Sequence, residues 1–308
     1  MSFYTGSGST LAINVPRQGW GDKVDTGYQA VNFTSEGINV TVEKADEGSL
    51  LASKTATTRD LMAVTVGGNV SFILRPEFAD KVFEAALGKK DGNTYTLCGV
   101  NEDLPIFDLY IDRKAAKKIY NSVTMSSFSL DCAAGDYVKG SFDVKGYKEE
   151  DGSAISNVEG LTIPSYRCTS AKLTLGGDTF DVSNTSISID NALEDAPKTY
   201  SSGLYANKPQ HGQRTVDVNF SIPYSTETDN LRATYLMTES NAAIHLEFTC
   251  NEATHPGHKI AIDLPNVAIT EVSNSIGGTG LIEASVAGTA LSVGSDEPIT
   301  VTITKPAV

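Results

Sequence analysis

The sequence of 308 residues has few of the features that mark a disulfide-rich, metal-binding or membrane-spanning protein. Its four cysteines, Cys98, Cys132, Cys168 and Cys250, lie far apart and form no CxxC pair, so we expect neither a disulfide framework nor a zinc site. No apolar run approaches the roughly 18 residues of a membrane span. Residues 1–8 are small and polar and do not read as a secretory leader. These absences predict folding in a reducing cytoplasm, with no membrane partner.

The motifs of common enzyme chemistry are also missing. There is no GxxxxGK[ST] phosphate loop, no strand-coupled GxGxxG, no HExxH and no GxSxG. Glu252, His255 and His258 could in principle hold a divalent metal, but the Pro and Gly between the two histidines favour a simple turn. His211 with Gly212 indicates a loop. We therefore predict a protein that is not an enzyme, with no catalytic, cofactor-binding or metal-binding residues and no cofactor.

Positive charge is scarce as well, because 24 basic residues face 38 acidic ones and the formal net charge is −14. A surface that binds the phosphate backbone by releasing counterions needs clustered lysine and arginine, so tight nucleic-acid binding is disfavoured. Hydrophobic residues make up 40% and charged residues 20% of the chain, which is ordinary for a folded globular protein.

The dominant positive signal is the alternation of apolar and polar residues over short segments, which is typical of half-buried strands. One segment has helical spacing instead: residues 76–87 begin with Pro76, carry an apolar stripe and end at Gly88. A turn near Gly135 joins the last two strands of this half. The predicted strands cover residues 38–42, 64–74, 95–97, 107–111, 123–130 and 137–144.

The second half of the chain repeats this order of elements. Residues 186–190 can be aligned with residues 39–43 at an offset of 147, and after a slip of one residue Phe220 falls on Phe72. A second helix is expected over residues 225–237, where a Ser or Thr ahead of Asp229 can cap it. The other strands predicted here cover residues 167–175, 179–182, 216–222, 244–248, 260–264, 267–272 and 281–287.

The repeat predicts an all-β protein with one flanking helix per repeat, in two tandem domains. The expected division is an N-terminal arm at 1–21, a first domain at 22–147, a linker at 148–164, a second domain at 165–290 and a C-terminal extension at 291–308. The two terminal segments and the loop at 45–60 are candidates for contacts between molecules.

A family resemblance rests on residues 47–54 (EGSLLASK), on residues 70–78 (VSFILRPEF) running into Ala86-Leu-Gly88, and on residues 123–146. Through these segments and the repeat, the chain resembles the major tail tube proteins of long-tailed, non-contractile phages (siphophages). The resemblance implies tail-tube-type β-sandwich or barrel domains, each flanked by a helix, whose strands join between subunits into a barrel around a channel.

The resemblance also implies a structural virion protein. Where single-copy relatives make six-membered rings, three duplicated chains would make a trimeric, pseudo-sixfold ring, and stacked rings would form the tube that conducts DNA to the host. The implied partners are further copies of the chain, a tape-measure protein, a tail terminator and distal tail proteins. DNA would pass transiently and without sequence preference through an acidic lumen. The expected place is the virion tail, assembled in the host cytoplasm.

Three other interpretations stay open. A tube protein of a contractile injection or secretion system would share the fold but usually lacks the duplication. A carbohydrate- or surface-binding β-sandwich module would need an exposed aromatic cluster, which the single Trp20 and scattered tyrosines support poorly. A β-rich hydrolase would need a pair of carboxylates, and a sequence alone cannot show which carboxylates approach each other.

Overall fold

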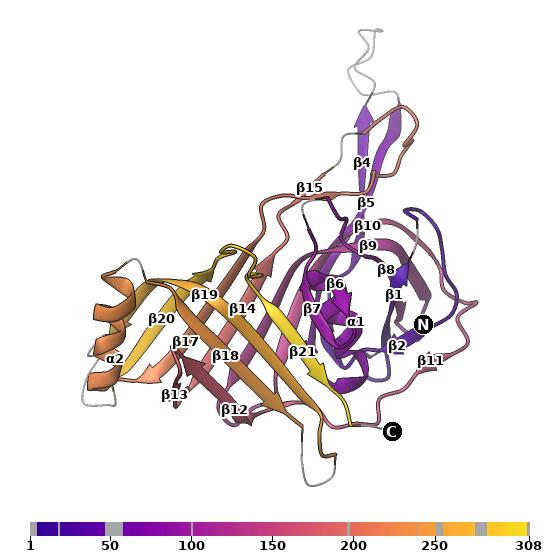
Figure 1. The fold of residues 1–308 in the computed structure, drawn as a ribbon. Helices are drawn as coiled ribbons and strands as arrows, with labels where there is room; N and C mark the ends of the chain where they lie inside the picture. Colours follow the sequence, from indigo (N-terminus) through magenta and orange to yellow (C-terminus); the bar gives the residue numbers. More distant parts are fainter. Residues whose placement is uncertain are drawn as a thin grey trace.

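A computed structural model of the chain describes residues 5–17, 19–46, 58–99, 101–195, 198–238, 240–250, 255–274 and 282–306. Within these ranges, nineteen strands join into one sheet, two short strands form a separate pair, and helices are few (Figure 1). This composition confirms the predicted all-β class. None of the helices in the described part of the chain has the length and apolar composition that a membrane crossing needs.

The centre of the molecule is a run of eight antiparallel strands that draws four from each half of the chain. Their order is β4, β5, β10, β9, β14, β17, β20 and β19. Strands β14, β17 and β20 alternate a buried side chain with a more exposed one, because successive residues point to opposite faces of a sheet. The bounds are β4 Asn39–Asp46, β5 Arg59–Ile73, β10 Lys139–Asp151, β9 Lys117–Ala133, β14 Asn184–Asp190, β17 Thr215–Pro223, β20 Glu283–Ala290 and β19 Lys259–Asn274.

In the first half, the sheet continues from β9 through β8 (Ile106–Asp112) and β1 (Thr10–Arg17) to β2 (Tyr28–Ala30). Helix α1 (Pro76–Leu87) covers the buried face, as the periodicity predicts, and Pro76 takes its first turn.

The core of the first half is aromatic. The ring of Phe72 packs against the rings of Phe78, Phe128 and Phe142 at centroid distances of 5.7, 6.4 and 5.8 Å. Burying one such side chain stabilises the fold by about 1.5–3 kcal/mol. The helix is therefore held by packing on the central strands.

The second half continues from β19 through β18 (Ala242–Thr249) and β12 (Arg167–Leu175) to β13 (Asp178–Phe180). Its helix α2 (Thr226–Leu231) follows β17 and is capped by the Ser225 hydroxyl, which accepts from the Thr228 N–H. A π-helical turn (Arg232–Leu236) extends it. The predicted second helix is therefore present, although only its first part is α-helical.

The two halves share an order of strand pairing. In the first half, the antiparallel pairs are β2–β1, β1–β8, β8–β9, β9–β10, β10–β5 and β5–β4. In the second half, they are β13–β12, β12–β18, β18–β19, β19–β20, β20–β17 and β17–β14. The hairpin β6 (Gly88–Asp91) and β7 (Thr94–Leu97) follows α1, whereas α2 leads to β18. Two strands predicted separately, at 260–264 and 267–272, are one strand, β19.

Parts of the two terminal segments, predicted as an arm and an extension, pair in the sheet as β1 and β21. Strand β1 lies between β2 and β8, with Leu11 and Ile13 fully buried. Strand β21 (Thr300–Thr304) lies between β19 and β7 and so connects the two halves. Both strands carry alternating apolar residues that are buried against the core. In β21 these residues are Val301 and Ile303. The expected linker is also partly paired, since β11 (Val158–Glu159) lies parallel to β2.

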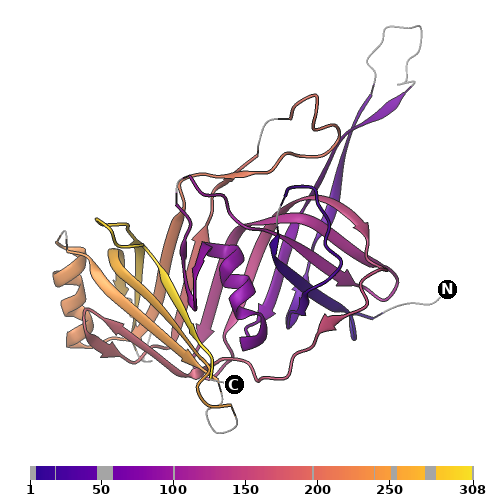
Figure 2. The ribbon, with the colours of Figure 1, turned by 45° about the vertical axis from the view of Figure 1, so that its right-hand side comes forward.

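The two halves meet where β9 pairs with β14. Asn191, which follows β14, is fully buried, and its amide donates to the carbonyls of Ala86 and Met125 at 3.1 and 3.0 Å. Beyond it, the chain from β15 (Leu193–Glu194) to β16 (Gln210–His211) runs along the first half, beside the hairpin β4–β5 that projects from the body (Figure 2). Its contacts include the bond from the Val64 N–H to the Leu204 carbonyl, at 2.8 Å.

Candidate channel wall and assembly edges

One face of the eight-strand run carries short polar side chains. The clearest row crosses six strands, from β5 through β10, β9, β14 and β17 to β20, with each residue opposite the next. Every side chain in it is a hydroxyl or a short carboxylate, so this row of the face is polar. The row consists of Ser71, Ser141, Ser129, Ser188, Asp217 and Thr289.

The charge of this face is acidic. Two lysines of this face are already paired, Lys139 with Asp136 and Lys145 with Asp195, at 2.5 and 2.9 Å. These pairs leave the carboxylates of the face in excess. The carboxylates are those of Asp131, Asp143, Asp190, Asp217, Glu271 and Glu283.

The run ends in two edges that lack a partner within the described part of the chain. At one end, β3 (Phe33–Glu36) and β4 follow one another along the outer side of β5 and pair only with it. At the other end, residues 268–274 of β19 pair with β20 on one side only. Unpaired backbone N–H and C=O groups at such edges are available to another strand.

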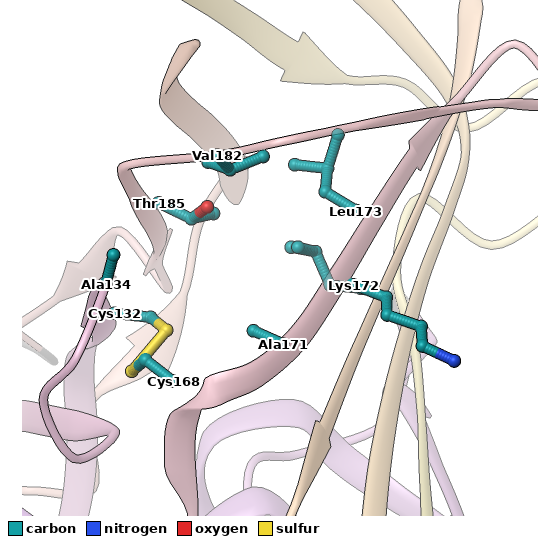
Figure 3. A pocket seen from close by; sticks show the side chains of 9 residues that line it. Cys132, Ala134, Cys168, Ala171, Lys172, Leu173, Val182 and Thr185 are labelled. Atoms are coloured by element: carbon teal, nitrogen blue, oxygen red, sulfur yellow. A yellow bond between two sulfur atoms is a disulfide. The ribbon is translucent and has the colours of Figure 1, made fainter. Parts of the chain in front are cut away.

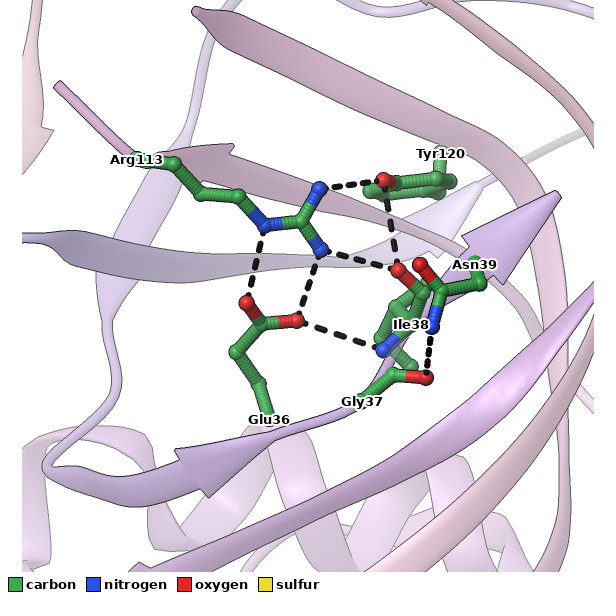
Figure 4. Close-up of polar contacts among 6 residues, drawn as sticks. All are labelled: Glu36, Gly37, Ile38, Asn39, Arg113 and Tyr120. Atoms are coloured by element: carbon green, nitrogen blue, oxygen red, sulfur yellow. Dashed lines mark hydrogen bonds and ion pairs between the residues drawn. The ribbon is translucent and has the colours of Figure 1, made fainter. Parts of the chain in front are cut away.

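The edge formed by β3 and β4 is shaped by an ion pair with three further hydrogen-bonding groups around it (Figure 4). Arg113 donates to both carboxylate oxygens of Glu36, at 2.8 Å each. Its remaining N–H groups donate to the Tyr120 hydroxyl at 2.9 Å and to the Ile38 carbonyl at 2.8 Å. The Ile38 N–H donates back to Glu36. These contacts fix the turn between β3 and β4 against β8 and β9.

The network also changes the acidity of its members. Hydrogen bonding to Arg113 holds the pKa of Glu36 below its ordinary 4.5, against the opposing effect of burial. The same contact raises the pKa of Arg113. Burial is the main cause that raises the pKa of Tyr120. Glu36 and Arg113 therefore form a charged pair at neutral pH.

Gly68 gives the same edge its geometry. It lies on β5 opposite the turn between β3 and β4, with φ at +142°, a value that side chains disfavour. A Cβ at this position would overlap the Gly37 carbonyl oxygen. Strand β5 can approach the turn between β3 and β4 this closely only because Gly68 has no side chain.

A disulfide lies beside the junction of the halves and corrects the expectation that the cysteines are unpaired. Cys132 of β9 and Cys168 of β12 are joined, with their Cα atoms 5.6 Å apart. The sequence separation of 36 residues hid this pair, because only the fold brings the two strands together. A cavity of about 30 Å³ beside it, lined in part by Ala171, Leu173 and Thr185, has room for one or two waters (Figure 3).

The residues predicted as a conceivable metal site are only partly described. Glu252 lies outside the described residues. His258 is buried, and burial lowers its pKa. His211 contacts the Glu102 carbonyl at 2.8 Å. In the described ranges, no group of three or more His, Cys, Asp or Glu side chains could hold a metal ion.

Comparison with known proteins gives one finding of similarity. A family model described as phage tail tube protein matches residues 6–304, nearly the whole chain. No curated protein matches the chain.

Proposed function

Because this chain belongs to the phage tail tube protein family, we propose that it polymerises as stacked rings into the tail tube of a long-tailed, non-contractile phage and conducts DNA to the host. The family supports a structural tail component that assembles with itself. The observation that carries the proposal is the eight-strand run, which has a polar face and, within the described residues, an open edge at each end. Copies joined edge to edge would close into a barrel without free strands.

We infer that the chain is a duplicated unit. Six antiparallel pairings recur in the same order in both halves, and a helix follows the long strand in each. Each half supplies four strands to the central run. Three chains would then provide six units, which supports a trimeric ring with pseudo-sixfold symmetry.

The acidic face is proposed as the channel wall. Fixed negative charges repel the phosphate backbone, and short polar side chains offer no apolar or aromatic surface on which a base could stack. DNA would therefore pass through the tube without binding tightly to it.

Stacking of rings is a head-to-tail contact, which produces a filament because it does not close. The projecting hairpin β4–β5 is the proposed contact between rings, since Val42, Leu61 and Met62 are 45%, 40% and 51% exposed on it. The loop at 47–57 between its strands lies outside the described residues. A tape-measure protein, a tail terminator and distal tail proteins are the proposed partners, with assembly in the host cytoplasm.

Electron microscopy of the purified full-length chain, alone and with tail-tip components, tests the proposal. We expect hollow tubes whose end-on class averages show three chains and six similar densities per ring. Rings of six chains would contradict the trimer. A protein that stays monomeric at high concentration and with tail-tip components would contradict the tube.

A further inference from the structure

We propose a specific strand register for the contact between neighbouring chains in a ring. The free edge of β19 pairs antiparallel with β4 of a second copy, with Glu271 opposite Thr41 and Ser273 opposite Asn39. This inference rests on the proposed ring. The inference goes beyond the proposed ring by naming the two strands that pair and the residues that face each other.

The template is the junction inside the chain, where β9 of the first half pairs with β14 of the second. There, Ser127 lies opposite Asp190 and Ser129 lies opposite Ser188. The contact between chains would be the same junction, formed by β19 in the place of β9 and by β4 in the place of β14.

The equivalence of β9 and β19 is fixed by an irregularity in both strands. The pairing of β9 with β10 skips one residue between Met125 and Ser127. The pairing of β19 with β20 skips one residue between Ile269 and Glu271. Aligning the two bulges sets a shift of 144 residues (271 minus 127).

The remaining pairs agree with this shift. Val123 lies opposite Gly146 next to the first bulge, and Val267 lies opposite Ala290 next to the second. Val123 lies 144 residues before Val267, and Gly146 lies 144 residues before Ala290. Ser127 therefore corresponds to Glu271, and Ser129 corresponds to Ser273.

The equivalence of β4 and β14 follows from their partners β5 and β17. The residue just before each helix is Arg75 in the first half and Ser225 in the second, a shift of 150 residues (225 minus 75). The backbone agrees, because the residue before it donates its N–H to the residue that precedes β10 or β20: Leu74 to the Val138 carbonyl, and Tyr224 to the Ile282 carbonyl.

This shift carries Gly67 of β5 onto Asp217 of β17. Gly67 lies opposite Asn39, and Asp217 lies opposite Ser188. Asn39 therefore corresponds to Ser188. The same shift carries Thr65 of β5 onto Thr215 of β17. Thr41 lies opposite Thr65 and Asp190 lies opposite Thr215, so Thr41 corresponds to Asp190.

The side chains at the two edges suit this pairing. In the internal junction, Phe128 and Ile189 lie opposite each other and are buried. Their counterparts, Val272 and Val40, are only partly buried in the single chain and lie against its core. The proposed register places these two valines side by side on the core face, so a second copy would cover both. The polar pairs then face the channel.

Cysteine cross-linking of the full chain in assembled tubes tests the register. Thr41→Cys with Glu271→Cys puts two thiols on residues directly opposite each other. The control, Asn39→Cys with Glu271→Cys, shifts one partner by two residues on the same face. Directly opposite Cβ atoms lie about 4.5–5.5 Å apart and diagonal ones about 7–8 Å, so we expect at least about tenfold more disulfide-linked oligomer from the matched pair.

A second variant tests the edge without cross-linking. Val272→Asp places a charge on the core side of the free edge, and we expect a folded chain by circular dichroism that no longer forms tubes. Ser285→Asp, on the paired neighbouring strand, should still form them.

The outcomes separate the register from the ring itself. Tubes in which the shifted pair cross-links better than the matched pair, or in which Val272→Asp assembles normally, overturn the register and leave the tube proposal standing. Absence of tubes from the wild-type chain overturns both.

Discussion

At the scale of single residues, the contact of Glu36 with Arg113 holds the turn between β3 and β4, the edge proposed for assembly. Glu36 ends β3, and the turn that follows leads directly into β4. The side chains of the pair are 16% and 36% exposed, so water screens their attraction only in part. The pair also binds both backbone groups of Ile38. Loss of the carboxylate would free the turn and leave the guanidinium without its counter-charge.

We expect Glu36→Gln to lower the free energy of unfolding by about 1.5–3 kcal/mol near neutral pH, the contribution of hydrogen bonds to charged groups. The pKa of Glu36 is depressed in the folded state, so its stabilisation is complete above the unfolded value and disappears as pH falls through the lower, folded value. The gap between wild type and variant should therefore shrink below about pH 4.5. Denaturant titrations across this range measure it.

The control for this variant is Asp46→Asn. Asp46 accepts two hydrogen bonds from Arg59, as Glu36 does from Arg113, but this pair is exposed to solvent. Exposed pairs contribute little to stability. Equal losses in the two variants would contradict the role assigned to burial at Glu36.

At the scale of elements, the junction of the two halves combines strand pairing, a disulfide and a long connection. The disulfide joins β9, which belongs to the central run, to β12, which starts the outer part of the second half. The connection from Asn191 to Arg214 returns across the first half, and Arg214 donates to the carbonyl of Cys98. The internal junction is therefore held by a disulfide and by side-chain hydrogen bonds in addition to the pairing of β9 with β14.

Reduction of the Cys132–Cys168 bond should lower the free energy of unfolding by about 2–4 kcal/mol, because the cross-link restricts the unfolded chain. Thermal or denaturant unfolding with and without a reductant measures this loss. In the variant with Cys132→Ser and Cys168→Ser, the reductant should have no further effect. A wild-type chain that is indifferent to the reductant would show that this bond does not contribute.

At the scale of the whole molecule, both halves contribute carboxylates to one exposed face of the eight strands. The carboxylates of Asp143 on β10 and Asp190 on β14 both flank Ser127 of β9 in one cross-strand row. The acidic surface therefore continues across the junction of the halves. In a closed ring it would line the channel.

Replacing Asp143, Asp190 and Asp217 with lysine should convert the wall into a DNA-binding surface while leaving strand pairing intact. Tubes assembled with short duplex DNA would then hold nuclease-resistant DNA, and raising the salt concentration should release it. The matched control carries lysine at Asp25, Asp91 and Asp178, which are exposed outside the wall. Wild-type tubes that protect DNA, or wall-variant tubes that do not, would contradict the repulsive channel.

The sequence by itself determined the class of the fold and most of its elements. Alternation of apolar residues gave the central strands, since one face of each is buried, and α1 spans the predicted residues 76–87. The phage tail tube resemblance, which rests on these strand and helix patterns, agrees with the family match. The helix after β17 was also predicted, because its cap and apolar residues are local signals.

Only the tertiary structure decided the neighbours and the register. Alternation repeats every two residues, so a strand shifted by two fits a buried face equally well. The sequence alignment matched Val40 to Ile187, whereas strand pairing matches Val40 to Ile189. Hydrogen-bond register, the bulges, the cysteine pair and the carboxylates that share one face depend on contacts between distant segments. Such contacts leave no mark on the local pattern of residues.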